Sequence, residues 1–414
     1  MSAFSIPLSG LAASSDSLNV IANNLSNLNT DGYKDETLNF ADVFNEMQGV
    51  SGNGDPIQIG SGVEVAGQTS NYTNGTVTAT GIASNMALQG NGFFVVQSGG
   101  NGELAYTRDG DFSVNSQGEL CTAQGQLVMG YPAVDGVVST STALAPINVN
   151  QAANVPAQET SSFSMDTNLN AGAAPGDTFS TPLTVYDSLG TQQTLTVTFT
   201  NTAPGAWNYS VTLPASATGG TGGATTLASG AMTFDSSGNL TSPTSPVTGI
   251  KVSGLADGAA PLNLSWSLTG PGGVSLITQQ TGTSATTSTT QNGYGVGTLT
   301  GYSVLSDGTV QGQFSNNQTM ALGQVAVASF ANDQGLTQLG NNDLQATFAS
   351  GSAVIGQAAA GGNGSITGGA VEESNVNLST EFANMIVAQQ GYDANAKALT
   401  TMDQISQATI QMIT

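Results

Sequence analysis

The stretch that decides the fold is residues 4–29, FSIPLSGLAASSDSLNVIANNLSNLN. A seam of mostly apolar residues recurs there in steps of four and three, at Phe4, Leu8, Leu11, Ser15, Leu18, Ala22, Leu25 and Leu28. A repeat of about 3.5 residues predicts one amphipathic helix that packs along this seam against another helix. We expect the helix to end near Asn29, because the run Asn29-Thr30-Asp31-Gly32 is rich in helix breakers.

The other end of the chain carries a second seam of the same period. Its positions are Leu378, Phe382, Met385, Tyr392, Ala396, Leu399, Ser406, Ile410 and Ile413. We predict a helix from about Leu378 to Thr414, roughly 55 Å long at 1.5 Å per residue. Asn377 is the expected N-cap, and Glu381 places negative charge in the first turn, where the helix dipole favours it.

Neither helix can bury its apolar stripe alone, so each must meet the other helix or a copy of itself in a neighbouring subunit. Periodicity leaves both possibilities open. The candidate assembly residues on the two seams are Leu11, Leu18, Leu25, Phe382, Met385, Tyr392 and Leu399. Gly391 is the expected weak point of the second helix, and Gly10 costs the first about 1 kcal/mol relative to alanine.

Between the helices the chain alternates apolar and polar residues as β-strands do. The strongest hairpin signal joins Thr194–Thr200 to Trp207–Leu213 across a turn-rich segment. The fold class is therefore multidomain and mainly β with long α-helical termini, coiled-coil-like at the ends and with nested β-domains. The expected parts are terminal helices at 1–30 and 371–414, a connecting segment at 31–70, a discontinuous inner β-domain at 71–145 and 285–370, and an inserted outer β-domain at 146–284.

Composition removes many functions from consideration. The 414 residues include no His and only four basic residues against 27 acidic ones, a net charge of -23. The chain therefore has neither imidazole chemistry nor a positive patch for nucleic acid. No stretch approaches the roughly 20 apolar residues of a membrane span, and the N-terminus lacks the pattern of a cleaved signal. The lone Cys121 is expected to be a small core residue.

Short patterns that could carry chemistry have simpler explanations. Asp109-Gly110-Asp111 lacks the Glu that closes a calcium loop and is more simply a turn with two solvated carboxylates. The pair Glu372-Glu373 could serve a glycosidase, but a solvated start to the following helix is the simpler interpretation. We therefore predict no catalytic residue, no metal site and no cofactor.

Three separated blocks resemble the bacterial flagellar rod and hook proteins. The first is Ala22-Asn23-Asn24-Leu25-Ser26-Asn27-Leu28-Asn29-Thr30-Asp31-Gly32-Tyr33-Lys34, the second Gly90–Val96 with Tyr106–Phe112, and the third Glu373–Leu378 with Met385–Gln389 and Tyr392–Ala396. The motif residues are Asn23, Asn24, Asn27, Thr30, Gly32, Tyr33, Asn375, Gln389 and Asn395. Residues Thr181–Gly190, the following strand and Trp207 look like the outer β-domain that hook proteins insert.

The resemblance implies a non-enzymatic subunit of the flagellar hook, a curved flexible tube of many copies that transmits motor torque from rod to filament as a universal joint. It implies terminal helices that line the tube, and export by the flagellar type III apparatus without a cleaved signal. Expected partners are copies of itself, the rod, the hook cap, the hook-filament junction proteins and the export apparatus, with no nucleic acid and no membrane insertion. The alternatives are a distal rod protein and, from another class, an extracellular adhesin or glycan-binding β-module.

Overall fold

A computed structural model describes residues 4–44, 46–50, 56–98, 102–151 and 153–413. The chain divides into two compact units. The first unit comprises residues 1–151, 301–313 and 319–414, and the second comprises residues 152–300 and 314–318. Both tryptophans, Trp207 and Trp266, lie in the second unit.

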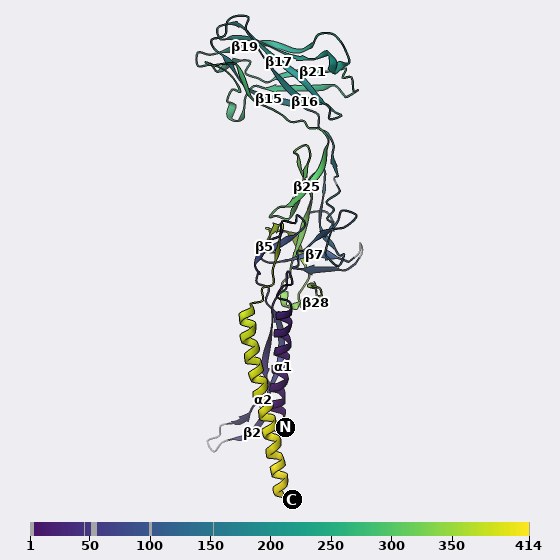
Figure 1. Cartoon of the computed structure of the whole chain (residues 1–414), viewed down its shortest axis with the longest axis vertical. Helices are drawn as coiled ribbons and strands as arrows, with labels where there is room; N and C mark the ends of the chain where they lie inside the picture. Colours follow the sequence, from purple (N-terminus) through teal and green to yellow (C-terminus); the bar gives the residue numbers. More distant parts are fainter. Residues whose placement is uncertain (1–3, 45, 51–55, 99–101, 152, 414) are drawn as a thin grey trace. The chain divides into compact units, whose positions relative to one another are not determined.

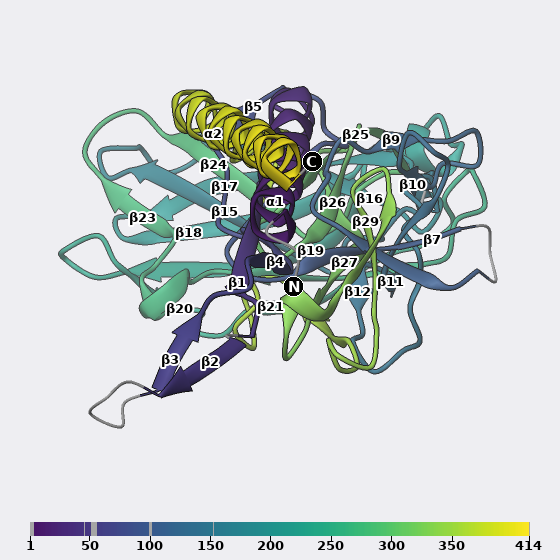
Figure 2. The same cartoon turned by 90° about the horizontal axis from the view of Figure 1, so that it is seen from below.

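Two long helices belong to the first unit. Helix α1 is Ser5–Ser26 and helix α2 is Leu378–Ile413. They run side by side in Figures 1 and 2, and antiparallel, since Gly10 faces Asn395 and Ser14 faces Gly391. Helix α1 ends three residues before the expected Asn29, because Asn27 already leaves the helical conformation as its C-cap. The predicted last residue of α2, Thr414, lies outside the described residues.

Asn377 is the N-cap of α2, as predicted. Its Oδ1 accepts hydrogen bonds from the backbone N–H groups of Ser379 at 3.0 Å and Thr380 at 3.1 Å. These two bonds satisfy amides that have no partner within the helix, which explains why α2 begins at this residue.

The first unit carries a large, mostly antiparallel sheet and several small ribbons. The main sheet has the strand order β25-β26-β27-β11-β7-β8-β29-β28, and residues 301–304 of β25 (Gly297–Val304) belong to this unit. Its strands are β26 (Thr309–Phe314), β27 (Thr319–Ser329), β11 (Leu127–Val134), β7 (Phe93–Gln97), β8 (Leu104–Thr107), β29 (Asp343–Gln345) and β28 (Thr337–Gly340), with β9 (Ser113–Val114), β10 (Leu120–Cys121), β12 (Val137–Val138), β13 (Ala145–Pro146) and β30 (Val354–Gln357) attached. The ribbons are β1 (Glu36–Asp42) with β4 (Val63–Ser70), β2 (Glu46–Val50) with β3 (Pro56–Ile59), β5 (Val77–Ala79) with β32 (Ala370–Glu372), and β6 (Met86–Gln89) with β31 (Ser365–Gly368).

Aromatic and aliphatic side chains from the central strands form a core of this unit. It contains Phe93, Val95, Tyr106, Met129, Tyr131, Ala326, Ala328 and Leu344. Cys121 is buried, as expected for a small core residue. The β5–β32 and β6–β31 ribbons pair residues 77–79 and 86–89 with residues 370–372 and 365–368, so backbone hydrogen bonds join the segment before α2 to the start of the β-domain.

The second unit consists mainly of two sheets that share one core. One has the order β16-β17-β18-β19-β20 and the other β21-β22-β15-β23, with β24 also paired to β15. The strands are β15 (Ser162–Asn170), β16 (Thr178–Tyr186), β17 (Gln192–Ala203), β18 (Ala206–Leu213), β19 (Thr225–Phe234), β20 (Leu240–Ser242), β21 (Val247–Val252), β22 (Leu262–Ser267), β23 (Ile277–Gln280) and β24 (Ala285–Gln291); β14 (Asn154–Val155) and the start of β25 (Gly297–Val304) complete it. The predicted hairpin is β17–β18.

The inward-facing residues of both sheets meet around Trp207 and Trp266, both fully buried. Tyr209 stands edge-on to Trp266, with ring centroids 5.4 Å apart. Strand β24 pairs with β15, so residues 285–291 belong to the second unit. The threonine-rich strand β24 lies at the edge of its sheet, where β15 completes its hydrogen bonds.

Candidate functional site

The first motif builds the turn that leads out of α1. Thr30 donates a hydrogen bond from Oγ1 to the side-chain oxygen of Asn27, at 3.2 Å. Gly32 has a φ of +70°, and a Cβ there would lie 2.5 Å from the backbone nitrogen of Asp109. Only glycine fits both the conformation and the close approach. The Gly32 N–H donates to the backbone oxygen of Glu372 at 2.7 Å, so this turn also contacts the C-terminal segment.

The paired asparagines of the motif anchor α1 to β1. Asn24 is buried, and its Oδ1 accepts from the Tyr33 hydroxyl at 3.0 Å and from the Glu36 N–H at 3.1 Å. Its Nδ2 donates to the Glu36 carbonyl at 2.8 Å. Asn23 donates to the Tyr33 hydroxyl oxygen at 3.1 Å. Burial raises the pKa of Tyr33, so its hydroxyl remains a donor throughout the physiological range.

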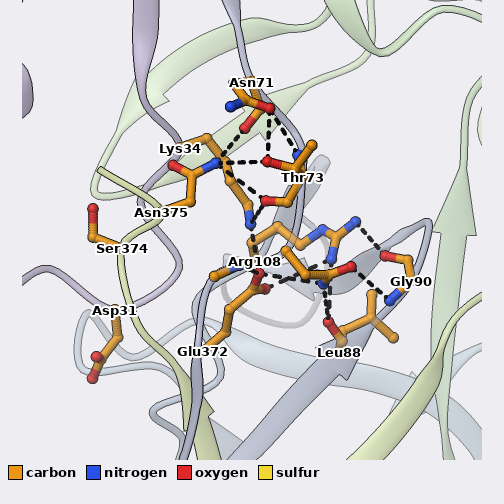
Figure 3. Close-up of polar contacts among 12 residues, drawn as sticks. Asp31, Lys34, Asn71, Thr73, Leu88, Gly90, Arg108, Glu372, Ser374 and Asn375 are labelled. Carbon is orange, nitrogen blue, oxygen red and sulfur yellow. Dashed lines mark hydrogen bonds and ion pairs between the residues drawn. The ribbon is translucent and has the colours of Figure 1, made fainter. Parts of the chain in front are cut away.

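A buried ionic cluster lies next to this turn (Figure 3). Lys34 Nζ is 2.6 Å from Glu372 Oε1, and Arg108 lies 3.7 Å from Glu372 Oε2. The Gly75 N–H also donates to Oε1, at 2.7 Å. Burial lowers the pKa of Lys34, and the Glu372 carboxylate opposes this shift. Lys34, Glu372 and Arg108 are called the ionic latch below; it uses two of the four basic residues in the chain.

Backbone carbonyls supply further hydrogen-bond acceptors for the two cations. Lys34 Nζ donates to the Thr73 carbonyl at 2.9 Å, and Arg108 donates to the carbonyls of Gly90 at 2.7 Å and Leu88 at 3.3 Å. The Arg108 guanidinium also lies over the ring of Phe93, 5.2 Å from its centroid. The latch therefore joins the end of the N-terminal motif, the central sheet and the segment that precedes α2.

Asn375 of the C-terminal block adds a second set of bonds at the same place. Its Oδ1 accepts from the Asp35 N–H at 2.7 Å, and its Nδ2 donates to the carbonyls of Asn71 at 2.7 Å and Thr73 at 3.1 Å. One asparagine thus bridges two N-terminal segments (Figure 3). Seven of the nine motif residues, Asn23, Asn24, Asn27, Thr30, Gly32, Tyr33 and Asn375, form the turn after α1 or its bonds to the C-terminal segment.

The other two motif residues lie on α2, where Gln389 is exposed and Asn395 is half-buried. The side chain of Asn395 covers Gly10 of α1, and a Cβ at Gly10 would lie 2.8 Å from the Asn395 amide atoms. A Cβ at Gly391 would lie 3.2 Å from the Ser14 hydroxyl oxygen. The glycines, expected only as weak points, therefore allow the two helices to approach closely.

The apolar seams lie beside this glycine contact. Leu11, Leu18 and Leu25 are half-buried on α1, as are Met385 and Leu399 on α2. Phe382 remains 50% exposed and Tyr392 37% exposed. With 100° of rotation per residue, all these positions fall on one flank of the helix pair. This apolar flank is incompletely covered by the described part of the chain.

The interpretation of Glu372 as a solvated residue before the helix is wrong. The side chain is fully buried and is held by Lys34, whereas Glu373 is exposed and accepts a hydrogen bond from Thr78. Asp109 is also not a solvated turn residue, since it is half-buried and burial raises its pKa to about 6. Sequence reasoning missed the ionic latch because Lys34 and Glu372 lie 338 positions apart in the chain. The scarcity of basic residues was the available signal.

No group of three metal-ligating side chains that could hold an ion comes together within the described ranges. None of the described helices is long and apolar enough to cross a membrane. What the site contains is a junction between a helix pair and a β-domain, with an exposed apolar flank on the helices. Such an apolar flank is typical of subunits that pack against other chains.

Comparison with known proteins agrees with this class, that of flagellar axial proteins. Four family models match in order: flagella basal body rod protein at residues 6–34, flagellar hook protein FlgE/F/G D1 domain at 87–168, flagellar basal body protein FlaE D2 domain at 148–294, and flagellar basal body rod FlgEFG protein C-terminal at 367–412.

Relatives match over nearly the whole length. The flagellar hook protein FlgE of Escherichia coli (strain K12) is 36% identical over 97% of this chain and 98% of its own length. That of Salmonella typhimurium is 37% identical with the same coverage, and that of Borreliella burgdorferi is 32% identical over 98% of both chains. The chain belongs to the flagellar hook protein FlgE family. The crystal structure of Helicobacter pylori FlgE2 covers 70% of this chain and 98% of its own, with a TM-score of 0.51 at 14% identity, and shares the fold.

Proposed function

We propose that many copies of this chain form the flagellar hook, a curved tube that bends while it rotates and transmits torque from rod to filament. The observation that carries this proposal is the apolar flank of the helix pair, which includes Phe382 and Tyr392. Large apolar side chains left half-exposed on two adjoining helices mark an interface with other chains. Burying them in a polymer would stabilise it by about 25 cal/mol per Å² of apolar surface.

The division of the chain into terminal helices, connecting segment, inner β-domain and inserted β-domain provides a mechanism for bending. In the proposed tube the helices at 1–30 and 371–414 line the inner wall, the segment at 31–70 connects them to the inner β-domain, and the inserted β-domain is outermost. A rotating bent tube lengthens and shortens each row of subunits once per turn, so outer contacts must slide between arrangements of similar energy. A chain with 7% charged residues offers few ion pairs that would hold one arrangement.

The ionic latch has a distinct role in this mechanism. Torque must pass between the helices and the β-domains, and the buried Lys34–Glu372 pair and the partly buried Asn375 hydrogen bond join these parts. Breaking a buried ion pair is costly because it leaves an unpaired charge in a site that excludes water. The junction therefore stays rigid while contacts between subunits change.

The proposed location is the hook of the bacterial flagellum, outside the cell, reached by flagellar type III export without a cleaved signal. The proposed partners are the rod below, the hook cap during growth, the hook-filament junction proteins above and the export apparatus. We propose no catalytic activity, no bound cofactor, no nucleic-acid partner and no insertion into a membrane.

Negative-stain microscopy of the purified full chain, induced to polymerise, tests the proposal. Curved tubes of uniform diameter are expected. Straight, rigid tubes would favour the distal rod alternative. A chain that remains monomeric under all polymerising conditions and binds a glycan in an array screen would overturn the proposal in favour of a binding module.

A further inference from the structure

A groove of about 600 Å³ lies on the other flank of the helix pair, bounded by α1, α2, β1 and the start of β4. Its apolar lining includes Val20, Phe40, Val63 and Val387. Phe40 is 44% exposed and Val387 is 69% exposed. The groove therefore presents apolar surface that the described part of this chain does not cover.

Carboxylates lie at one end of the groove. Glu36 and Glu381 both line it and are both buried. The Glu36 carboxylate accepts hydrogen bonds from Gln68 and Gln338. Glu381 Oε2, in contrast, is buried and has no hydrogen-bond donor among the described residues. A buried carboxylate oxygen without a donor is destabilising, so a cation supplied from outside would be bound favourably.

One basic residue is available to supply that cation. Lys34 and Arg108 are committed to the ionic latch, and Lys251 lies in the second unit. Lys397 is exposed on α2 and forms no ion pair with the residues that the structure describes. It cannot reach Glu381 of its own chain, because 16 residues of helix separate the two by about 24 Å.

The face of α2 that carries Lys397 matches the groove. At helical spacing, Lys397 shares this face with Ala394, Thr401, Ile405, Ala408 and Met412, all exposed. Ile405 is 62% and Met412 is 82% exposed. Because Gly10 faces Asn395, residues beyond about 400 extend past Ser5, where α1 begins, as Figure 1 shows. This face is thus a small apolar stripe with one positive charge. It complements the groove, which is apolar and has carboxylates at one end.

We propose that the C-terminal half of α2 from a second copy occupies this groove, with its Lys397 bound to Glu381. The inference rests on the proposed self-assembly and names two surfaces that meet. The contact is heterologous, as an open helical tube requires, since the groove and the Lys397 face are different surfaces of the same molecule. Copies with a net charge of -23 repel one another, so one well-placed cation contributes strongly to the choice of register.

Charge reversal at Lys397 tests the contact in the full chain. Lys397→Glu should raise the critical concentration for polymerisation at least tenfold, as measured by sedimentation, and Lys397→Arg should leave it within twofold of the starting protein. The matched control is Lys251→Glu, the same charge change in the second unit, which should also polymerise normally. Circular dichroism of each monomer shows whether the variants fold alike.

Cross-linking tests the register. Copies in a tube run parallel, so a Lys397–Glu381 contact brings Val387 of one copy near position 404 of the next. In a Cys121→Ser background, Val387→Cys with Gln404→Cys should give disulfide-linked ladders in the polymer only. The two sites lie about 26 Å apart within one chain, far beyond disulfide reach.

Absence of either result in tubes that otherwise form normally overturns this inference and leaves the proposed function standing. Failure of the starting protein to polymerise overturns the proposed function, and the inference with it.

Discussion

Lys34 Nζ and Glu372 Oε1 lie 2.6 Å apart, although 338 positions separate the two residues in the chain. One ends the N-terminal motif and the other precedes α2, so a single buried ion pair ties the two ends of the sequence together. Backbone pairing of β5 with β32 reinforces the tie. This junction holds both helices on the same β-domain, in addition to their direct contact at Gly10 and Asn395.

Glu372→Gln should destabilise the first unit by about 3–5 kcal/mol, because it leaves Lys34 and Arg108 without their shared counter-ion. Hydrogen exchange followed by mass spectrometry should show faster exchange in β5, β6 and β32. Tryptophan fluorescence should be unchanged, since both tryptophans belong to the second unit. Exposed Glu373→Gln is the control. Equal exchange rates in the two variants would contradict a structural role for the latch.

Gly10→Ala should impair assembly even though alanine favours a helix by about 1 kcal/mol over glycine. The added Cβ would lie 2.8 Å from the Asn395 amide and push α2 away. The double variant Gly10→Ala/Asn395→Ala removes the clashing Asn395 amide, so it should restore part of the sedimentable polymer that Gly10→Ala loses. Gly67→Ala is the control, since nothing lies within 4 Å of its Cβ. Normal assembly of the single variant would show that close helix packing is dispensable.

The free energy of unfolding of the first unit should fall as pH rises from about 4 to about 6, because Asp109 loses its proton in this range. Burial raises the pKa of Asp109 to about 6, and the neighbouring carboxylates of Asp111, Asp31 and Asp343 add to the shift. The folded state therefore holds a proton that the unfolded chain has released, and ionising it costs on the order of 2–3 kcal/mol.

Asp109→Asn removes that cost, so its advantage over the starting protein in urea unfolding should grow between pH 4 and pH 6 and then level off. A constant difference across this window would mean that Asp109 does not carry the effect.

Phe382→Asp should abolish polymerisation while it changes the stability of the monomer by no more than about 0.5 kcal/mol, because Phe382 is 50% exposed in the single chain. Leu18→Asp should also abolish assembly but destabilise the helix pair, since Leu18 is half-buried. Val274→Asp, at a similarly exposed apolar position in the second unit, is the comparison variant. Normal tubes from Phe382→Asp would exclude the apolar flank as an interface.

Local periodicity determined much of this protein without tertiary information. The seams of α1 and α2, the Asn377 cap and the β17–β18 hairpin follow from the spacing of residues along the chain, because each depends on neighbours within a few positions. Composition, with no His and four basic residues, also predicts no imidazole chemistry and no nucleic-acid interface.

Tertiary structure decided which helix faces meet and which charges are buried. Spacing shows that Leu18 and Met385 lie on apolar stripes, but Gly10 and Asn395 form the contact, since the helices approach most closely where side chains are smallest. Glu372 looked solvated beside Glu373, yet it is buried because strands β5 and β32 bring it to Lys34. Contacts between residues hundreds of positions apart depend on how the strands pair, and no local pattern in the sequence records that pairing.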